Sequence, residues 1–96
     1  MRENKFQAKL IKEIESRLPG CLVLKNDANY IQGIPDLSVF YKDRWAFLEC
    51  KKSSTAEHQY NQDDYIEYAQ QNSIGAFIYP ENKEAVLNEL QRALGA

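Results

Sequence analysis

The 96-residue sequence predicts an α/β fold in which a mixed sheet is flanked by helices. Apolar residues recur every three to four positions near both ends of the chain, as they do in amphipathic helices. Between these segments lie short apolar runs bounded by Gly, Pro, Asn or Asp, which are typical of strands. The elements follow the order α-β-β-β-α-β-α with no repeat or internal linker, so we expect a single domain over residues 1–96.

The N-terminal third predicts a helix, a strand and a loop. The helix continues to Pro19-Gly20, which end it. Cys21–Leu24 is a continuous apolar run between turn residues and predicts a fully buried strand. A polar loop over 25–34 follows, and Pro35 favours extended backbone before it, which leads the chain into the next strand. The helix residues expected to face the core are Phe6, Leu10, Ile14 and Leu18.

The middle of the chain predicts a β-hairpin. Leu37–Tyr41 and Trp45–Leu48 are apolar runs joined by a polar turn over 42–44. Antiparallel pairing about this turn would bring the start of the first strand beside the end of the second. We therefore expect Asp36 and Glu49 to be neighbours although they lie thirteen positions apart in sequence.

The end of the second hairpin strand should carry two charged side chains on one face. Side chains alternate along a strand, so Glu49 and Lys51 point to one face while Leu48 and Cys50 point to the other. With Asp36 alongside, two carboxylates and an ammonium would converge at one end of the sheet.

The C-terminal part predicts a helix, a strand and a second helix. The first helix spans about 57–71 and has few apolar positions, so we expect it to be more exposed. The run 74–79 predicts a further buried strand, which Pro80 stops. Asn82 is expected to cap the last helix. The apolar stripe of that helix is Val86, Leu87, Leu90 and Leu94.

Composition points to a globular protein without a membrane segment. Hydrophobic residues make up 44% of the chain, but no apolar run approaches the roughly 20 residues of a membrane span. No hydrophobic segment follows the first residues as in a signal peptide, so we expect a cytoplasmic protein with reduced thiols. Cys21 and Cys50 each lie in an apolar run and are expected to be buried and free.

The charge distribution neither requires nor excludes a nucleic-acid partner. The net charge of −2 argues weakly against one. Residues 1–52, however, carry ten basic and seven acidic side chains, whereas residues 53–96 carry two basic and seven acidic ones. The basic excess thus belongs to the half that contains the hairpin.

The clustered acids of the hairpin predict a metal site. Carboxylates at such short range repel each other, and a divalent hard cation relieves this. Mg²⁺, or Mn²⁺ in its place, would bind Asp36, Glu49 and the backbone carbonyl of Cys50. The metal would lower the pKa of a bound water, and Lys51 would orient that water or stabilise charge on an attacked phosphate. The alternative is an ion pair of Glu49 with Lys51 that serves structure alone.

These residues resemble a known nuclease signature. Pro35-Asp36 followed by Glu49-Cys50-Lys51 is similar to the motif of the PD-(D/E)XK nucleases, and the element order matches the restriction-endonuclease-like core of that superfamily. The detail resembles the small stand-alone phage and bacterial members of its VRR-NUC branch, although Cys50 stands where that branch usually has an aliphatic residue. The matching features are Gly33-x-Pro35-Asp36-Leu37, Phe47-Leu48-Glu49-Cys50-Lys51, Gln62 and Tyr79-Pro80-Glu81-Asn82.

The resemblance implies roles for several residues. Asp36 and Glu49 would bind metal, and Lys51 would serve catalysis. A helical glutamine that follows the lysine maps best to Gln62, with Gln59 as the weaker candidate.

An acid on the first helix often completes the metal site in this family. Glu3 is the best match for it and Glu13 the second, although a charge at the start of a helix can also serve the helix alone. Basic residues expected to flank the site and contact DNA phosphates are Lys25, Lys42, Arg44, Lys52 and His58.

The resulting expectation is a metal-dependent endonuclease that cuts branched DNA, most simply a Holliday-junction resolvase acting as a homodimer. It would be encoded by a bacterium or a phage. Exposed apolar candidates for the dimer interface are Tyr65, Tyr68 and the stripe of the last helix. The alternatives are a flap, nicking or restriction-type nuclease, and a branched-DNA-binding module without catalysis.

Overall fold

The structure, a computed structural model, describes residues 3–57 and 62–95 and confirms the predicted α/β fold and element order. The helices and strands are α1 (Glu3–Arg17), β1 (Leu22–Lys25), β2 (Leu37–Tyr41), β3 (Arg44–Cys50), α2 (Gln62–Asn72), β4 (Ile74–Ile78) and α3 (Lys83–Leu94).

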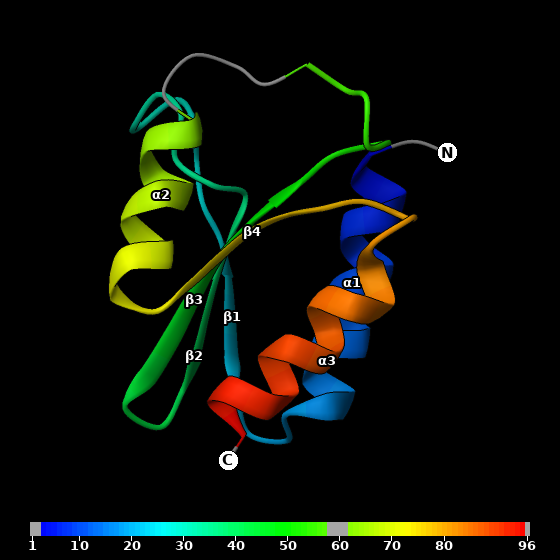
Figure 1. The fold of residues 1–96 in the computed structure, drawn as a ribbon, viewed down its shortest axis with the longest axis vertical. Coiled ribbons are helices and arrows are strands. Elements are labelled where there is room, and N and C mark those ends of the chain that lie inside the picture. Colours follow the sequence, from blue (N-terminus) through cyan, green and yellow to red (C-terminus); the bar gives the residue numbers. More distant parts are fainter. Residues whose placement is uncertain (1–2, 58–61, 96) are drawn as a thin grey trace.

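The four strands form one mixed sheet in the order β1-β2-β3-β4. The strand pairs β1/β2 and β2/β3 are antiparallel, whereas β3 and β4 are parallel and are connected through α2. The sheet separates two helical layers: α1 and α3 pack together on one face, and α2 lies on the other (Figure 1). The expected mixed sheet flanked by helices is therefore present.

The core lies between the sheet and the pair α1 and α3. The three predicted core positions within α1 and Leu18, which directly follows it, are all buried, as expected for an apolar stripe that faces a sheet. The hairpin presents alternate residues to the same core, because Leu37 and Val39 of β2 pair with Leu48 and Ala46 of β3.

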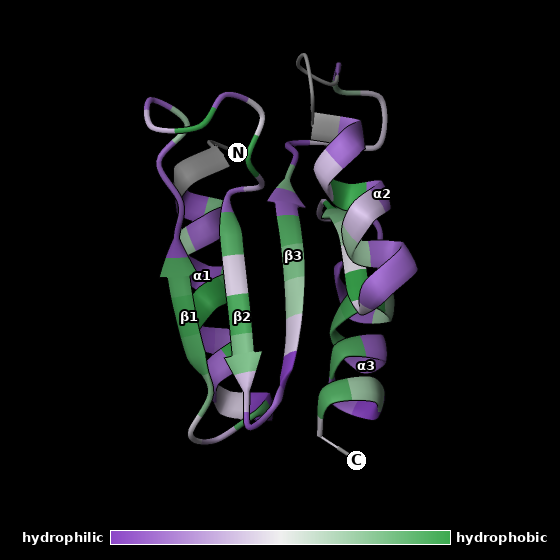
Figure 2. Cartoon of the chain, turned by 90° about the vertical axis from the view of Figure 1, so that its left-hand side faces the viewer, coloured by the Kyte–Doolittle hydropathy of each residue, from purple (hydrophilic) through white to green (hydrophobic). Residues whose placement is uncertain are grey.

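The prediction that the first strand is fully buried is wrong. β1 is an edge strand, and Leu22 and Leu24 are 54% and 43% exposed. They face the side of the sheet on which α2 contacts β3 and β4 only, so no helix of the described chain covers them (Figure 2). The strand also begins one residue later than predicted and includes Lys25.

The last strand is likewise less buried than predicted. It ends at Ile78, one residue before the expected Tyr79, and Ile78 is its one fully buried residue. Its position at the other edge of the sheet explains this.

Glu57, the predicted start of the helix α2, is not helical. Ala56 and Glu57 lie outside it, and the described helix starts at Gln62. The backbone carbonyl of Glu57 accepts a hydrogen bond from the Lys51 ammonium at 3.1 Å. As expected, α2 is largely exposed, and of its described side chains only Ile66 and Ala69 are buried.

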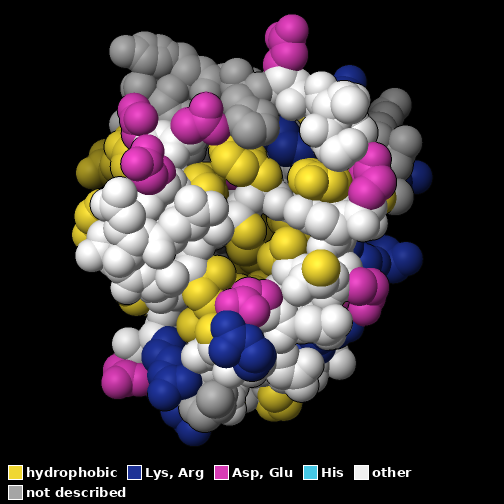
Figure 3. All heavy atoms as spheres, in the orientation of Figure 1, with side chains coloured by type: hydrophobic (Ala, Val, Ile, Leu, Met, Phe, Trp, Pro, Cys, Tyr) yellow, Lys and Arg dark blue, Asp and Glu magenta, His cyan; other side chains and the backbone are white. Residues whose placement is uncertain are grey.

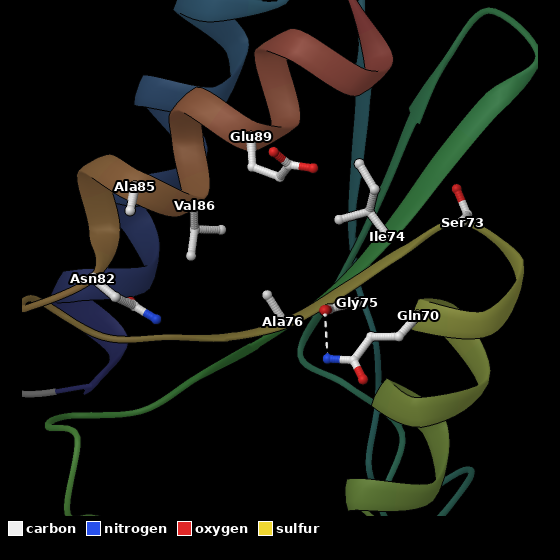
Figure 4. Close-up of a pocket in the computed structure, with 9 residues that line it drawn as sticks. All are labelled: Gln70, Ser73, Ile74, Gly75, Ala76, Asn82, Ala85, Val86 and Glu89. Carbon is white, nitrogen blue, oxygen red and sulfur yellow. Dashed lines mark hydrogen bonds between the residues drawn. The ribbon is translucent and has the colours of Figure 1, made fainter.

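Asn82 occupies the predicted N-cap position of α3, but its side chain does not cap the helix. Its amide instead donates to the carbonyl of Phe77 at 2.9 Å and accepts from the backbone N–H of Tyr79 at 2.8 Å. On the same strand, the Gln70 amide donates to the carbonyl of Gly75 at 3.1 Å (Figure 4). Two side-chain amides thus cover backbone carbonyls of β4.

The apolar stripe of α3 packs into the core, since Leu87, Leu90 and Leu94 are almost fully buried. These three leucines are therefore not accessible for the dimer interface considered above, whereas Val86 of the same stripe is partly exposed. Between α2 and α3, along β4, lies an open hollow of about 350 Å³ with apolar side chains at its floor (Figure 3).

Both cysteines are free, as predicted, although Cys21 is only half-buried. None of the described helices combines the length and the apolar character that crossing a bilayer requires.

Candidate active site at the open end of the hairpin

Asp36 and Glu49 meet at the open end of the hairpin, as the predicted pairing requires. The backbone N–H of Asp36 donates to Glu49 Oε1 at 2.9 Å. The backbone N–H of Cys50 donates to Asp36 Oδ2 at 2.9 Å. A backbone N–H at the end of each strand therefore binds the carboxylate at the end of the neighbouring strand. These two hydrogen bonds fix both acids relative to the sheet.

A loop residue that the sequence did not single out supports this corner. The Asn26 amide donates to the carbonyl of Pro35 at 2.9 Å and to Ser38 Oγ at 2.8 Å. The Asn26 backbone N–H also donates to the carbonyl of Asp36 at 2.8 Å. Asn26 thus ties the end of β1 to the turn that presents Asp36. Its only sequence signal is an asparagine two residues after an apolar run, which is too common to be diagnostic.

Lys51 lies beside the two acids and is buried, with 8% of its side chain exposed. Its ammonium is 3.7 Å from Glu49 Oε2 and donates to the carbonyl of Glu57 at 3.1 Å. Its backbone N–H continues the ladder to the carbonyl of Ile78 at 2.8 Å. The predicted sharing of one face by Glu49 and Lys51 is confirmed, and Leu48 and Cys50 pack into the core on the other face.

Burial raises the pKa of Asp36 above its ordinary value. The N–H of Cys50, the charge of Lys51 and a side-chain hydrogen bond with Glu49 each act in the opposite direction, but burial outweighs them. The folded protein therefore holds a proton at this corner more readily than the unfolded chain does.

Asp36→Asn is expected to stabilise the metal-free protein at neutral pH. Because the native pKa of Asp36 is raised, its favourable contribution is fully present below the unfolded pKa near 3.8 and is lost as pH rises through the native pKa. Asparagine keeps an acceptor for Cys50 but carries no charge. The unfolding temperature at pH 7 should rise by a few degrees, since about 1 kcal/mol corresponds to about 4–8 °C in such a domain.

Thermal unfolding between pH 4 and 8 in chelator tests this expectation. The gap between variant and wild type should widen with pH. Asp27→Asn, which changes an exposed acid in the adjoining loop, is the control. A variant less stable than wild type at pH 7 would contradict the assignment of a buried, unfavourable charge to Asp36.

The donor set suits a hard divalent cation. Asp36 and Glu49 are each held by a backbone N–H at the same end of the hairpin, and Mg²⁺ prefers such carboxylate oxygens. Cys50 directs its backbone N–H to Asp36, and the carbonyl of a strand residue faces the same side as its N–H. These three groups would hold the ion. Within the described side chains, no set of three or more His, Cys, Asp or Glu gathers at one point. Mg²⁺ usually keeps waters and substrate oxygens beside one or two carboxylates.

Several predicted site residues fall outside what the structure describes. His58 and the weaker glutamine candidate Gln59 lie in the segment 58–61. Glu3 and Gln62 begin α1 and α2, but their side chains are not among those described. The second acid considered for the first helix, Glu13, binds Lys83 of α3 at 3.1 Å and so has a structural partner.

The predicted flanking cations divide into two groups. Lys25 pairs with Leu37 at the end of β1, and the exposed Lys52 follows Lys51, so both lie at the end of the sheet that holds Asp36.

Lys42 and Arg44, in contrast, do not flank the site, and that prediction is wrong. They lie at the closed end of the hairpin, about 17 Å away along the five residues of β2. The Arg44 guanidinium donates to the carbonyl of Ala93 at the end of α3. The two acids lie at the open end of the hairpin, so the turn that contains Lys42 lies at the opposite end of its strands.

Comparison of the chain with models of known families, with curated proteins and with solved structures found no match.

Proposed function

We propose that this protein is a metal-dependent endonuclease of the PD-(D/E)XK superfamily, VRR-NUC branch, which hydrolyses DNA phosphodiesters. The observation that carries the proposal is the reciprocal anchoring of Asp36 and Glu49, with the buried ammonium of Lys51 at 3.7 Å from Glu49. A buried lysine next to two acids supports a chemical role more than a structural one, because a purely structural pair is rarely removed from water.

The three groups supply complementary parts of a hydrolysis. Mg²⁺ bound by Asp36 and Glu49 would provide an activated water and neutralise charge on the phosphate. Lys51, held by the carbonyl of Glu57, points its ammonium toward the same corner and would stabilise the charge that develops on the attacked phosphate. Lys52, which is exposed next to Lys51, would contact a neighbouring phosphate and position the strand.

We propose a four-way junction as the substrate, cut by a homodimer in the cytoplasm of a bacterium or a phage-infected cell. A domain of this size offers little surface to hold branched DNA, and a two-fold substrate suits a two-fold protein. The metal-site chemistry leaves the DNA shape undetermined, so substrate comparison is the decisive measurement.

The experiment is cleavage of labelled four-way junction, flap, nicked and linear duplex DNA in millimolar Mg²⁺ and in chelator. We expect Mg²⁺-dependent cutting that is fastest on the junction. Faster cutting of a flap or nick would replace the junction with that substrate. Junction binding without cutting in either Mg²⁺ or Mn²⁺ would contradict the nuclease proposal and leave a DNA-binding module.

A further inference from the structure

The outer edge of β1 combines an open backbone edge with an exposed apolar surface. β1 ends the sheet, and no strand of the described chain pairs with its outer side (Figure 2). Leu22, Leu24 and Phe40 are 54%, 43% and 40% exposed. Leu22 pairs with Phe40 and Leu24 with Ser38, so all three apolar side chains lie on one face of two neighbouring strands. We call them the open-face patch.

The hydrogen-bond pattern shows which backbone groups point outward. The N–H of Asn26 donates to the carbonyl of Asp36 on the β2 side. Backbone direction alternates along a strand, so Leu24 and Leu22 also face β2, whereas Val23 and Lys25 direct their N–H and C=O groups away from it. β1 can therefore accept another strand through Val23 and Lys25. Edges of this kind are usually blocked by charge, proline or a covering element.

We propose that β1 pairs antiparallel with β1 of a second copy of this chain, centred on Val23, so that two sheets join into one. This interface deepens the homodimer of the proposed function, but its geometry follows from the strand alone. Val23 opposite Val23 makes a pair that exchanges two hydrogen bonds, which a two-fold axis permits because both residues are identical.

The same register matches side chains on both faces of the joined sheet. Leu22 of each copy lies opposite Leu24 of the other copy. These two pairs are at positions without hydrogen bonds, where side chains approach most closely. Each leucine pair continues into Phe40 on the neighbouring strand. The open-face patches of the two copies thus meet in one continuous apolar surface.

Charge is complementary on the opposite face. Val23 packs against the core on the α1 side, and alternation places Lys25 and Cys21 on that side too. Burial raises the pKa of the Cys21 thiol, and the charge of the nearby Glu15 on α1 raises it further. In the proposed register Lys25 faces Cys21 of the second copy, so each Lys25 meets an exposed Glu15 across the interface. Within one chain Lys25 and Cys21 are separated by the length of β1, about 13 Å.

A two-fold axis perpendicular to the sheet keeps both candidate active sites on the same side of the joined sheet. With strand spacings of about 4.8 Å and a rise of about 3.3 Å per residue, the two Asp36–Glu49 corners lie roughly 25–30 Å apart. This part of the inference rests on the proposed function, and it gives one DNA molecule access to both sites.

Sedimentation velocity across a wide range of micromolar concentrations tests the interface without any nuclease assay. The wild type should dimerise. Leu24→Lys sets a charge beside the apolar pairs and should weaken dimerisation at least about tenfold while circular dichroism stays native, because Leu24 is exposed. Leu24→Met, which stays apolar, is the matched control and should dimerise as the wild type does.

Charge reversal then tests the register. Lys25→Glu alone and Glu15→Lys alone should each weaken the dimer, and the double variant should recover most of the loss, since the charges only meet between copies. A monomeric wild type at the highest concentration overturns the proposal, as does a dimer indifferent to Leu24→Lys. A double variant that dimerises no better than the single variants overturns the Val23-centred register. Dimerisation without DNA cleavage would retain this interface and reject the nuclease.

Discussion

The Lys51→Met variant is expected to cut DNA about 10²–10³-fold more slowly than the wild type, with little change in DNA affinity. The ammonium of Lys51 is buried beside Glu49 and is oriented by the carbonyl of Glu57, so it is preorganised for charge that develops in the transition state. Methionine has a similar length and suits a buried site, which keeps the backbone contact to Ile78 and the packing around it.

Lys52→Met provides the matched control for this variant. Lys52 is the next residue, carries the same charge and is exposed. Its loss should weaken DNA binding uniformly and reduce the salt dependence of binding, while single-turnover cleavage of bound DNA stays within a few-fold of the wild type. Equal single-turnover rates for Lys51→Met and the wild type would reject Lys51 as a catalytic residue.

Gly75→Ala is expected to destabilise the protein by about 1–3 kcal/mol, which corresponds to a drop of at least about 4 °C in unfolding temperature. A Cβ at this position would lie 2.5 Å from the carbonyl oxygen of Ile66 and 2.7 Å from the Cβ of Ala69. Both atoms belong to α2, and one is backbone, so α2 would have to move away from β4. Gly75 thus sets the close approach of α2 to the sheet.

A double-mutant cycle with Ala69→Gly isolates the steric cause. Removing the Ala69 methyl relieves one of the two clashes, so the cost of Gly75→Ala should be smaller in the Ala69→Gly background. Gly20→Ala is a useful comparison, because an added Cβ there meets no atom within 4 Å and its cost comes from the positive φ of 91°. Strictly additive effects of Gly75→Ala and Ala69→Gly would contradict the close-approach explanation.

The sequence predicted the elements that local pattern determines. The apolar stripe of α1 and the hairpin were identified correctly because periodicity and turn residues are properties of neighbouring positions. The meeting of Asp36 and Glu49 followed from the hairpin, since antiparallel pairing converts sequence spacing into proximity. The burial of β1 was mispredicted for a different reason: Leu22 and Leu24 look like core residues, and only the position of the strand in the sheet decides that one face stays open.

The surroundings of the site were harder to predict than its acids. Asn26 and the Glu57 carbonyl contact the site through backbone and amide groups that almost any sequence could supply. The misplacement of Lys42 and Arg44 came from treating sequence proximity to the acids as spatial proximity. The catalytic roles of Asp36, Glu49 and Lys51, the metal and the DNA substrate stay predictions.

The two amides on β4 would limit the assembly proposed above. Gln70 and Asn82 occupy the carbonyls of Gly75 and Phe77, on the strand at the other end of the sheet from β1. Two chains joined through β1 would present β4 at both outer ends of the combined sheet, where a further strand would have to displace these amides. Strand addition would therefore stop at the dimer. The exposed edge of β1 could then serve association without leading to open-ended fibres.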